Sequence, residues 1–192
     1  KAKAKAAKKA LPKIGSIHSA KITALHSLHA DVSLEEVPVR GRIHITEAID
    51  PETLPHNGSP LSSFVPGSTL QVVALGKMQS AEGKRHNLYE FSSRASTLAA
   101  AEKDEATPHN ELRRISWKSI VPGQKLQGYI QEVSGEYIWV VLTPNIRGRI
   151  FLPRVAKTLE ECISAHRVYK IGSCVEVAVH SIDAEKKSLD LT

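Results

Sequence analysis

An internal repeat limits the possible folds of this chain more than any other feature of its sequence. Residues 39–45 read Val-Arg-Gly-Arg-Ile-His-Ile and residues 146–152 read Ile-Arg-Gly-Arg-Ile-Phe-Leu, so seven positions correspond. Further matches follow in the same order in both halves, at 14–16 and 121–123, 30–34 and 138–142, 64–68 and 169–173, and 88–92 and 188–192. Matches in a fixed order predict two copies of one small structural unit within the 192 residues.

The matched segments carry the pattern of β-strands. Apolar residues recur at every second position in 30–34 and 138–142, and alternation returns in 70–75 and 175–182, as expected of strands with one buried face. Each copy therefore has about five strands in roughly 75 residues, which is the strand count of a small Greek-key barrel. The predicted fold class is all-β, with two tandem five-stranded OB-fold β-barrels joined by a short, partly helical linker.

The predicted segments are a basic tail at 1–13, a first, degenerate barrel at 14–94, a linker at 95–116 and a second barrel at 117–192. The linker begins with an Ala-rich, charged stretch, and Pro108 ends any helix there. Between its third and fourth strands the second copy carries 157–166, which predicts one or two helical turns. The matching insert, 47–63, holds three prolines that exclude a long helix.

The formal charge of +6 lies wholly in the tail. Six lysines and no acid stand in 1–13, which leaves 20 basic and 20 acidic side chains in 14–192. The tail is expected to be a solvated linker, with nonspecific phosphate contact as the alternative. The folded part is neutral, so its charge balance indicates no particular partner.

Several targeting and redox features are missing from the sequence. No apolar run approaches the roughly 18 residues of a membrane-spanning helix, so a soluble chain without a membrane partner is expected. The first residues show neither an initiator Met nor a signal peptide, which indicates an internal fragment. Cys162 and Cys174 match no metal or redox motif and are expected to be reduced, which weakly favours a reducing compartment.

Taken in order, the motifs resemble those of a known family. Each copy has an initial Gly, an alternating strand, a Gly-x-Ile-x-Ile or similar strand and a further Gly, and the second copy ends Ile-Asp-x-Glu-Lys-Lys-x-Leu-x-Leu-Thr. This pattern resembles the S1 motif of RNA-binding proteins over about 14–94 and 117–192, and the second copy fits better. Within that family, 142–150 is similar to repeats of the large nucleolar pre-rRNA processing factors, the ribosomal RNA-processing protein five or programmed cell death protein eleven family.

The resemblance implies a fold of tandem S1-type barrels and a nucleolar ribosome-biogenesis role. Such a chain would bind single-stranded or structured pre-rRNA, support pre-rRNA processing and small- and large-subunit assembly, and contact other pre-ribosome assembly proteins. It would have no catalytic activity, no cofactor and no small-molecule substrate. The alternatives are protein-docking or spacer repeats of the same factor, or accessory RNA-binding domains of a ribonuclease or translation factor.

Strand alternation predicts an RNA-binding face on the second copy. Because i and i+2 share a face, burial of every second residue from Ile138 to Leu142 turns Tyr137, Trp139 and Val141 outward. Rings beside a positive charge can stack on bases, and OB folds bind nucleic acid on this part of the sheet. The candidate RNA-binding residues of this copy are Tyr137, Trp139, Arg147, Arg149, Phe151, Lys186 and Lys187.

Two alternatives remain open for these residues. The neighbouring domain or a loop could cover Trp139 and Phe151, since large aromatic side chains are mostly buried. Lys186 and Lys187 could simply belong to a solvated turn. Glu136 stands where the family often carries a ring, and Trp139 and Phe151 stand where it usually has a Phe and a His.

The first copy is expected to be the weaker RNA binder. The same alternation buries Ala30, Val32 and Leu34 and turns outward His29, Asp31, Arg42 and His44. Asp31 stands where a ring is expected, and its carboxylate would repel phosphate. Arg42 and His44 remain candidate RNA-binding residues, and the other phosphate candidates are Arg40, Lys84 and Arg85. This copy could instead contact protein or brace the second copy.

Metal and catalytic sites are not predicted. His26 and His29 form the tightest pair among the nine histidines, but no Cys or second His pair follows at zinc-ligand spacing. The stretch 76–84 has the wrong glycine spacing for a phosphate loop. No nucleophile motif or paired acids occur, so an enzyme is not expected.

Overall fold

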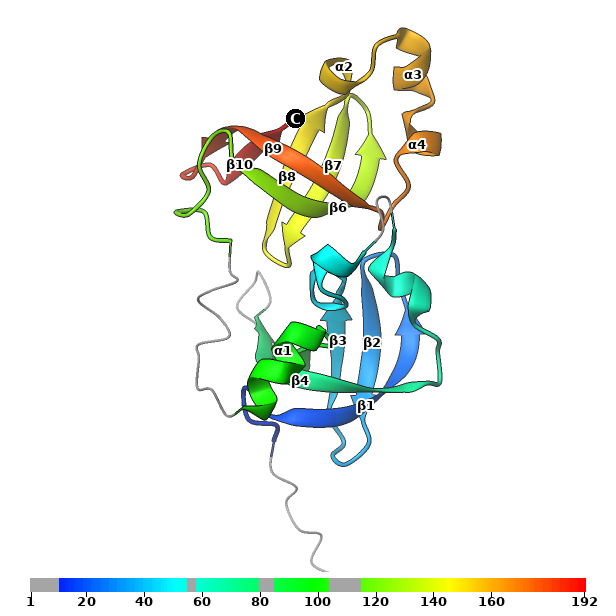
Figure 1. Cartoon of the computed structure of the whole chain (residues 1–192), viewed down its shortest axis with the longest axis vertical. Helices are drawn as coiled ribbons and strands as arrows, with labels where there is room; N and C mark the ends of the chain where they lie inside the picture. Colours follow the sequence, from blue (N-terminus) through cyan, green and yellow to red (C-terminus); the bar gives the residue numbers. More distant parts are fainter. Residues whose placement is uncertain (1–10, 55–57, 80–84, 104–114) are drawn as a thin grey trace, which may run out of the picture.

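The computed structural model describes residues 11–54, 58–79, 85–103 and 115–192. Two closed five-stranded barrels lie one beyond the other along the long axis of the molecule (Figure 1). The strands of the first barrel are β1 (Ile17–Leu25), β2 (His29–Leu34), β3 (Arg40–His44), β4 (Thr69–Gln79) and β5 (Arg85–Ser92). Those of the second barrel are β6 (Lys125–Ser134), β7 (Tyr137–Thr143), β8 (Ile146–Phe151), β9 (Cys174–Asp183) and β10 (Ser188–Leu191). The predicted fold class is confirmed.

Both barrels close in the same way. Around the first barrel the order is β1-β2-β3-β5-β4, and the second repeats it as β6-β7-β8-β10-β9. In each barrel the third strand pairs in parallel with the fifth, so that Arg42 faces Glu90 and Arg149 faces Asp190. The other pairings are antiparallel. The repeat seen in the sequence is therefore a repeat of topology and register.

The glycine of the shared Arg-Gly-Arg-Ile motif lies where the parallel strands come closest. A Cβ atom at Gly41 would overlap the carbonyl of Tyr89 and the ring of Phe91, and one at Gly148 would overlap Leu191. No side chain fits between these strands without moving the core. This packing explains why the motif retains its glycine in both copies.

Short helices occupy the inserts and the linker. In the first barrel the insert holds the 3-10 turns η1 (Ile45–Glu47), η2 (Pro51–Thr53) and η3 (Pro60–Ser63), and in the second it holds α2 (Leu152–Val155), α3 (Leu159–Ile163) and α4 (Ala165–Val168). The linker begins with α1 (Ala95–Glu102). Helical turns in the second insert, and no long helix in the described part of the first, agree with the prediction. Among the described residues, no helix has the length and apolar character needed to span a membrane.

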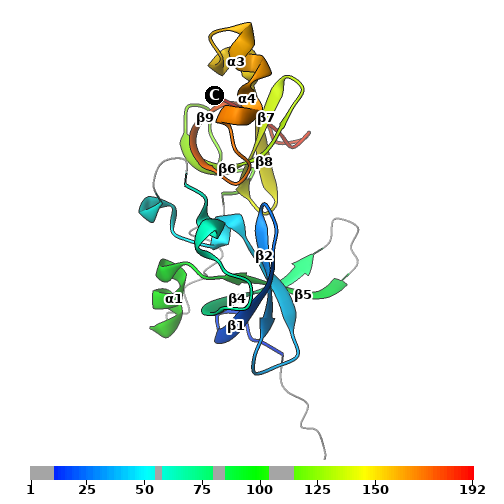
Figure 2. The ribbon, with the colours of Figure 1, turned by 90° about the vertical axis from the view of Figure 1, so that its right-hand side faces the viewer.

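The two barrels share an apolar interface. The core of the first barrel continues into Tyr129, Val141 and Cys174 of the second, each less than 9% exposed. The backbone N–H of Cys174 donates to the carbonyl of Gly58 at 2.9 Å. In the view turned by 90° (Figure 2), the ends of β7 and β8 approach β2. Both cysteines are free thiols, as predicted.

Candidate nucleic-acid interface

The outer face of β7 and β8 carries the residues that strand alternation predicted. The antiparallel register places Tyr137 opposite Phe151, Trp139 opposite Arg149, and Val141 opposite Arg147. Ile138, Val140 and Leu142 point into the barrel and are buried. Three cross-strand pairs therefore share one surface.

Three rings and two guanidinium groups form a contiguous group, here called the ring–arginine cluster: Tyr137, Trp139, Phe151, Arg147 and Arg149. The Tyr137 ring lies 6.4 Å from that of Trp139 and 5.6 Å from that of Phe151, centroid to centroid. Cζ of Arg147 lies 4.6 Å above the Trp139 ring, and Cζ of Arg149 lies 5.1 Å from the Tyr137 ring. Such cation–π contacts hold the charges beside the rings.

The neighbouring barrel leaves the rings partly exposed. Tyr137, Trp139 and Phe151 are all half-buried. The first barrel covers the next outward residue of β7, Val141, which is 6% exposed and joins the core of that barrel. The edge of the barrel–barrel contact therefore runs beside Trp139, and each of the three aromatic residues keeps part of its surface exposed.

The two arginines of the cluster differ in their partners. Nε of Arg149 donates to Oδ1 of Asp190 at 2.7 Å. This hydrogen bond raises the pKa of Arg149 and lowers that of Asp190. Within the described part of the chain, Arg147 has no carboxylate partner, and its side chain is exposed. Arg147 is therefore the readier contact for a phosphate.

The first barrel has the same register but different side chains at these positions. His29 faces His44, and Asp31 faces Arg42, in place of the Tyr–Phe and Trp–Arg pairs of the second barrel. Nε and Nη2 of Arg42 donate to Oε1 of Glu90 at 3.0 and 2.5 Å. Glu90 thus largely neutralises the charge of Arg42. The role of Arg42 in RNA binding remains a prediction.

The predicted exposure of His44 is wrong, because its side chain is buried at 7% exposure. The backbone N–H and the hydroxyl of Thr46 both donate to Nδ1 of His44, at 3.3 and 2.8 Å, so the ring caps the turn η1. Burial, and then the nearby Arg42 charge, lower the pKa of His44 to about 3. A neutral, buried ring cannot supply a positive charge to phosphate at neutral pH.

Asp31 lies against two histidines. Its carboxylate is 3.1 Å from Nε2 of His26 and 3.6 Å from Nε2 of His29, and the two rings stack at 4.4 Å. One ligand atom from each residue lies within 4.8 Å of the others, so among the described residues this group could hold a metal ion. In the sequence, only His26 and His29 stood out as a candidate metal-binding pair. Asp31, two positions beyond His29 on the same face of β2, completes the group.

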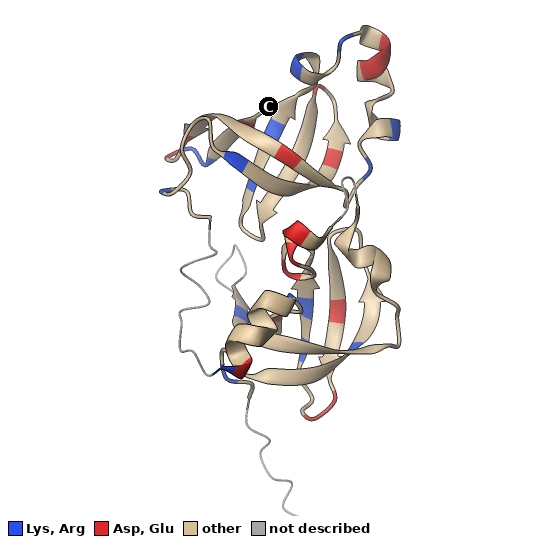
Figure 3. Ribbon diagram, viewed as in Figure 1, with Lys and Arg blue, Asp and Glu red and all other residues tan. Residues whose placement is uncertain are grey.

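The other basic candidates lie away from the cluster contacts. Lys186 and Lys187 occupy the β9–β10 turn, where Nζ of Lys186 is 3.5 Å from Asp183 and its side chain is 83% exposed. Arg40 is also exposed, at the start of β3. In the view of Figure 3, basic and acidic positions are interspersed along the described ribbon of both barrels. Lys84 and the Arg85 side chain lie outside the described residues.

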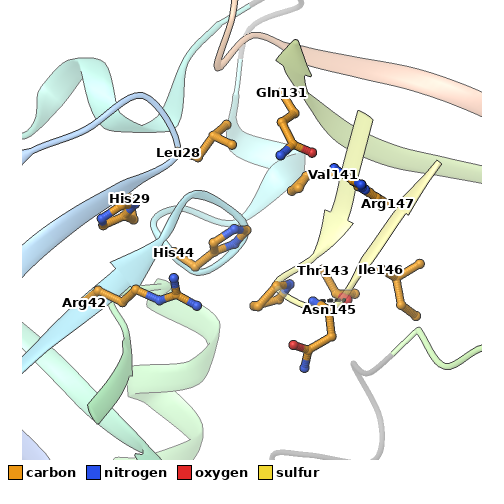
Figure 4. A pocket seen from close by; sticks show the side chains of 11 residues that line it. Leu28, His29, Arg42, His44, Gln131, Val141, Thr143, Asn145, Ile146 and Arg147 are labelled. Carbon is orange, nitrogen blue, oxygen red and sulfur yellow. Dashed lines mark hydrogen bonds between the residues drawn. The ribbon is translucent and has the colours of Figure 1, made fainter. Parts of the chain in front are cut away.

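A cavity between the barrels was not anticipated from the sequence. Its volume is about 380 Å³, and it is lined from the first barrel by His29, Arg42 and His44 and from the second by Gln131, Asn145 and Arg147 (Figure 4). These six residues come from strands and turns far apart in the chain. No sequence pattern reports how two barrels dock, so no local signal could have revealed this site.

Two curated proteins resemble the chain in sequence. The rRNA biogenesis protein RRP5 of Arabidopsis thaliana is 27% identical over 187 residues, which is 97% of this chain and 9% of that protein. The protein of the same name in Schizosaccharomyces pombe is 27% identical over 169 residues, or 86% of this chain and 10% of that protein. The chain thus spans about a tenth of these relatives. Protein-family profiles gave no match.

Solved structures give weaker likenesses. GSP13 from Bacillus subtilis matches with 19% identity and a TM-score of 0.33 over 38% of this chain and 55% of that one. A chain of the a/eIF2alpha-aDim2p-rRNA complex from Pyrococcus horikoshii matches with 16% identity and a TM-score of 0.36 over 50% and 54%. The sequence matches confirm the predicted resemblance of the two barrels to S1-type repeats of RRP5.

Proposed function

We propose that this chain, two S1-type repeats resembling part of RRP5, is an RNA-binding segment of a ribosome-biogenesis factor. It holds single-stranded or looped precursor rRNA on the ring–arginine cluster of the second barrel. One observation carries the proposal: three half-buried rings and two guanidinium groups lie side by side on the outer face of β7 and β8. The first barrel braces this face by covering Val141.

The cluster suits a nucleic-acid strand for two physical reasons. Base–aromatic stacking contributes about 1 to 3 kcal/mol per base, and it tolerates any base because every base has a π-face. The guanidinium groups of Arg147 and Arg149 lie close to those ring faces, where a stacked base brings its phosphate. Because the positive charges of Arg147 and Arg149 lie beside the rings, RNA binding does not require that the whole surface be basic.

The biological setting of the proposal comes from the curated relatives. Both are named as rRNA biogenesis proteins. We assign this chain, on that basis, to nucleolar pre-rRNA processing and to assembly of the small and large ribosomal subunits. It acts by binding, without catalysis, alongside other assembly proteins.

Binding of single-stranded RNA at two salt concentrations tests this function. The wild-type chain is compared with Trp139→Ala/Phe151→Ala, which removes two rings and leaves both arginines. The matched control is Leu159→Ala/Ile163→Ala, because these α3 side chains are 76% and 70% exposed in the same barrel. We expect Trp139→Ala/Phe151→Ala to lose about 1 to 3 kcal/mol of RNA-binding free energy for each base that no longer stacks. The control variant should bind RNA as the wild type does.

Protein docking is a second candidate, favoured by the exposed apolar residues of the α3–α4 insert. Besides Leu159 and Ile163, Val168 is 68% exposed and Ile171 54%, and a contiguous apolar patch on a surface marks a contact site. The same experiment separates the two functions. If Trp139→Ala/Phe151→Ala binds RNA as tightly as the wild type, the cluster is not an RNA platform, and the docking function replaces it.

A further inference from the structure

The cavity between the barrels is continuous with the ring–arginine cluster. Arg147 belongs to both, since its guanidinium lies over the Trp139 ring and its side chain also lines the cavity. Val141, next to Trp139 on the same face of β7, lines the cavity as well. A strand lying on the cluster therefore passes beside the cavity. The volume of about 380 Å³ falls within the range of small-molecule sites.

The cavity is lined by basic, neutral polar and apolar side chains, and one of its two arginines, Arg42, is paired with Glu90. Arg42 and Arg147 enter it from opposite barrels, with the neutral rings of His29 and His44 beside Arg42 (Figure 4). None of the described residues that line it is an Asp or a Glu. Leu28 and Val141 add apolar contact surface. This combination suits a flat, polar-edged ring that is attached to a phosphate.

Gln131 supplies an unused hydrogen-bond acceptor at this cavity. Its Oε1 atom is buried and has no hydrogen-bond partner among the described residues. Buried polar atoms nearly always have partners, so each exception needs a specific explanation. The side chain lines the cavity between the barrels (Figure 4). A ligand with an N–H donor would satisfy this atom.

The backbone places Gln131 there through a β-bulge. The β6–β7 register shifts between Ile130 and Glu132, so Gln131 has no partner on β7. Bulges re-aim side chains and are frequent beside functional sites. The first barrel has a bulge at the equivalent place, but there the hydroxyl of Thr23 donates to the carbonyl of Asp31 at 3.1 Å. Only the bulged residue of the second barrel faces the cavity with its acceptor unused.

We propose that this cavity accepts one nucleobase of the RNA strand bound on the ring–arginine cluster. A ring N–H or amino group of the base donates to Oε1 of Gln131, and the attached phosphate lies beside Arg147. The inference rests on the proposed RNA-binding function and adds to it a specific base site built by both barrels. The first barrel thereby contributes to RNA binding although its own outer face lacks the rings.

The test combines a side-chain change with the removal of single bases. Wild type, Gln131→Leu and the control Gln127→Leu are titrated with a mixed-sequence single-stranded RNA and with derivatives that each lack one base. Gln127 makes a matched control because it lies on the same strand and is exposed. Gln131→Leu is expected to bind the intact RNA about 3- to 10-fold more weakly, as for one lost hydrogen bond.

Coupling between the two changes identifies the base. In the wild type, removal of the base at one RNA position is expected to lower RNA affinity. In Gln131→Leu, removal of the same base should lower RNA affinity less, because the side chain that contacts this base is already absent. The difference between the two losses is the coupling of a double-mutant cycle. Gln127→Leu should behave as wild type throughout. The melting temperature of Gln131→Leu should equal or exceed that of the wild type, because the Gln131 side chain makes no hydrogen bond with the described residues.

The outcomes separate this inference from the proposed function. If Gln131→Leu binds as the wild type does while Trp139→Ala/Phe151→Ala loses affinity, the RNA function stands and the base site is wrong. If adenosine monophosphate alone occupies the cavity and displaces no RNA, the cavity is a mononucleotide site and the inference falls. If the wild type binds no RNA, both the function and the base site are wrong.

Discussion

Acidification is expected to weaken the fold through His44, the buried histidine at the end of β3. Burial lowers the pKa of His44 from 6.5 to about 3 in the folded chain. Between the two pKa values, the His44 side chain binds a proton in the unfolded chain but not in the folded chain. The contribution of neutral His44 to the free energy of unfolding is therefore complete above pH 6.5 and decreases as the pH falls toward 3. The slope there is about 1.4 kcal/mol per pH unit, which amounts to about 3 kcal/mol between pH 7 and pH 4.

Urea unfolding followed by circular dichroism at pH 7, 5.5 and 4 measures this loss. The variant His44→Phe carries the ring that the second barrel has at the equivalent position, and its free energy of unfolding should depend less on pH. Part of the pH dependence is expected to remain in His44→Phe, because burial also lowers the pKa of His29. His180→Phe, on an exposed position of β9, is the control. Equal pH dependence in the wild type and His44→Phe would refute the reasoning.

Two further changes test the parallel strand pair of the second barrel. Gly148→Ala should destabilise the chain by about 1 to 3 kcal/mol in thermal unfolding, because the added methyl group overlaps Leu191, whereas Ser134→Ala at the exposed end of β6 should be nearly neutral. Equal melting temperatures would show that the strands can separate without cost. Asp190→Asn should free Arg149 from its 2.7 Å hydrogen-bonded ion pair and steepen the salt dependence of RNA binding by about 0.7 in logarithmic slope. An unchanged slope would mean that Arg149 contacts no phosphate.

Local pattern predicted the barrels and the composition of their outer faces. The alternation in 138–142 placed Tyr137 and Trp139 outward, because side chains on a strand alternate faces whatever lies beyond the sheet. The register then follows from the same rule, since shifting it by one residue would expose the buried set. For this reason the ring–arginine cluster was predictable from the sequence before any contact was known.

The docking of the barrels was not predictable by the same rule. Alternation predicted that Val141 and His44 point outward, yet both are buried. Val141 joins the core of the first barrel, and the His44 ring caps the turn η1 of its own barrel. The position of Gln131 depends in addition on a bulge that interrupts the alternation of β6. Contacts between two folded units arise from residues distant in the chain, and a periodic pattern holds no information about them.

The most direct measurement of the central claim uses the two tryptophans of the chain. Trp139 belongs to the ring–arginine cluster, whereas Trp117 packs against the core of the second barrel. Their indole N–H resonances can be followed by NMR while single-stranded RNA is added to the wild-type chain. The account predicts that the Trp139 resonance shifts with saturation and that of Trp117 stays in place. An unmoved Trp139 resonance at saturating RNA would contradict it.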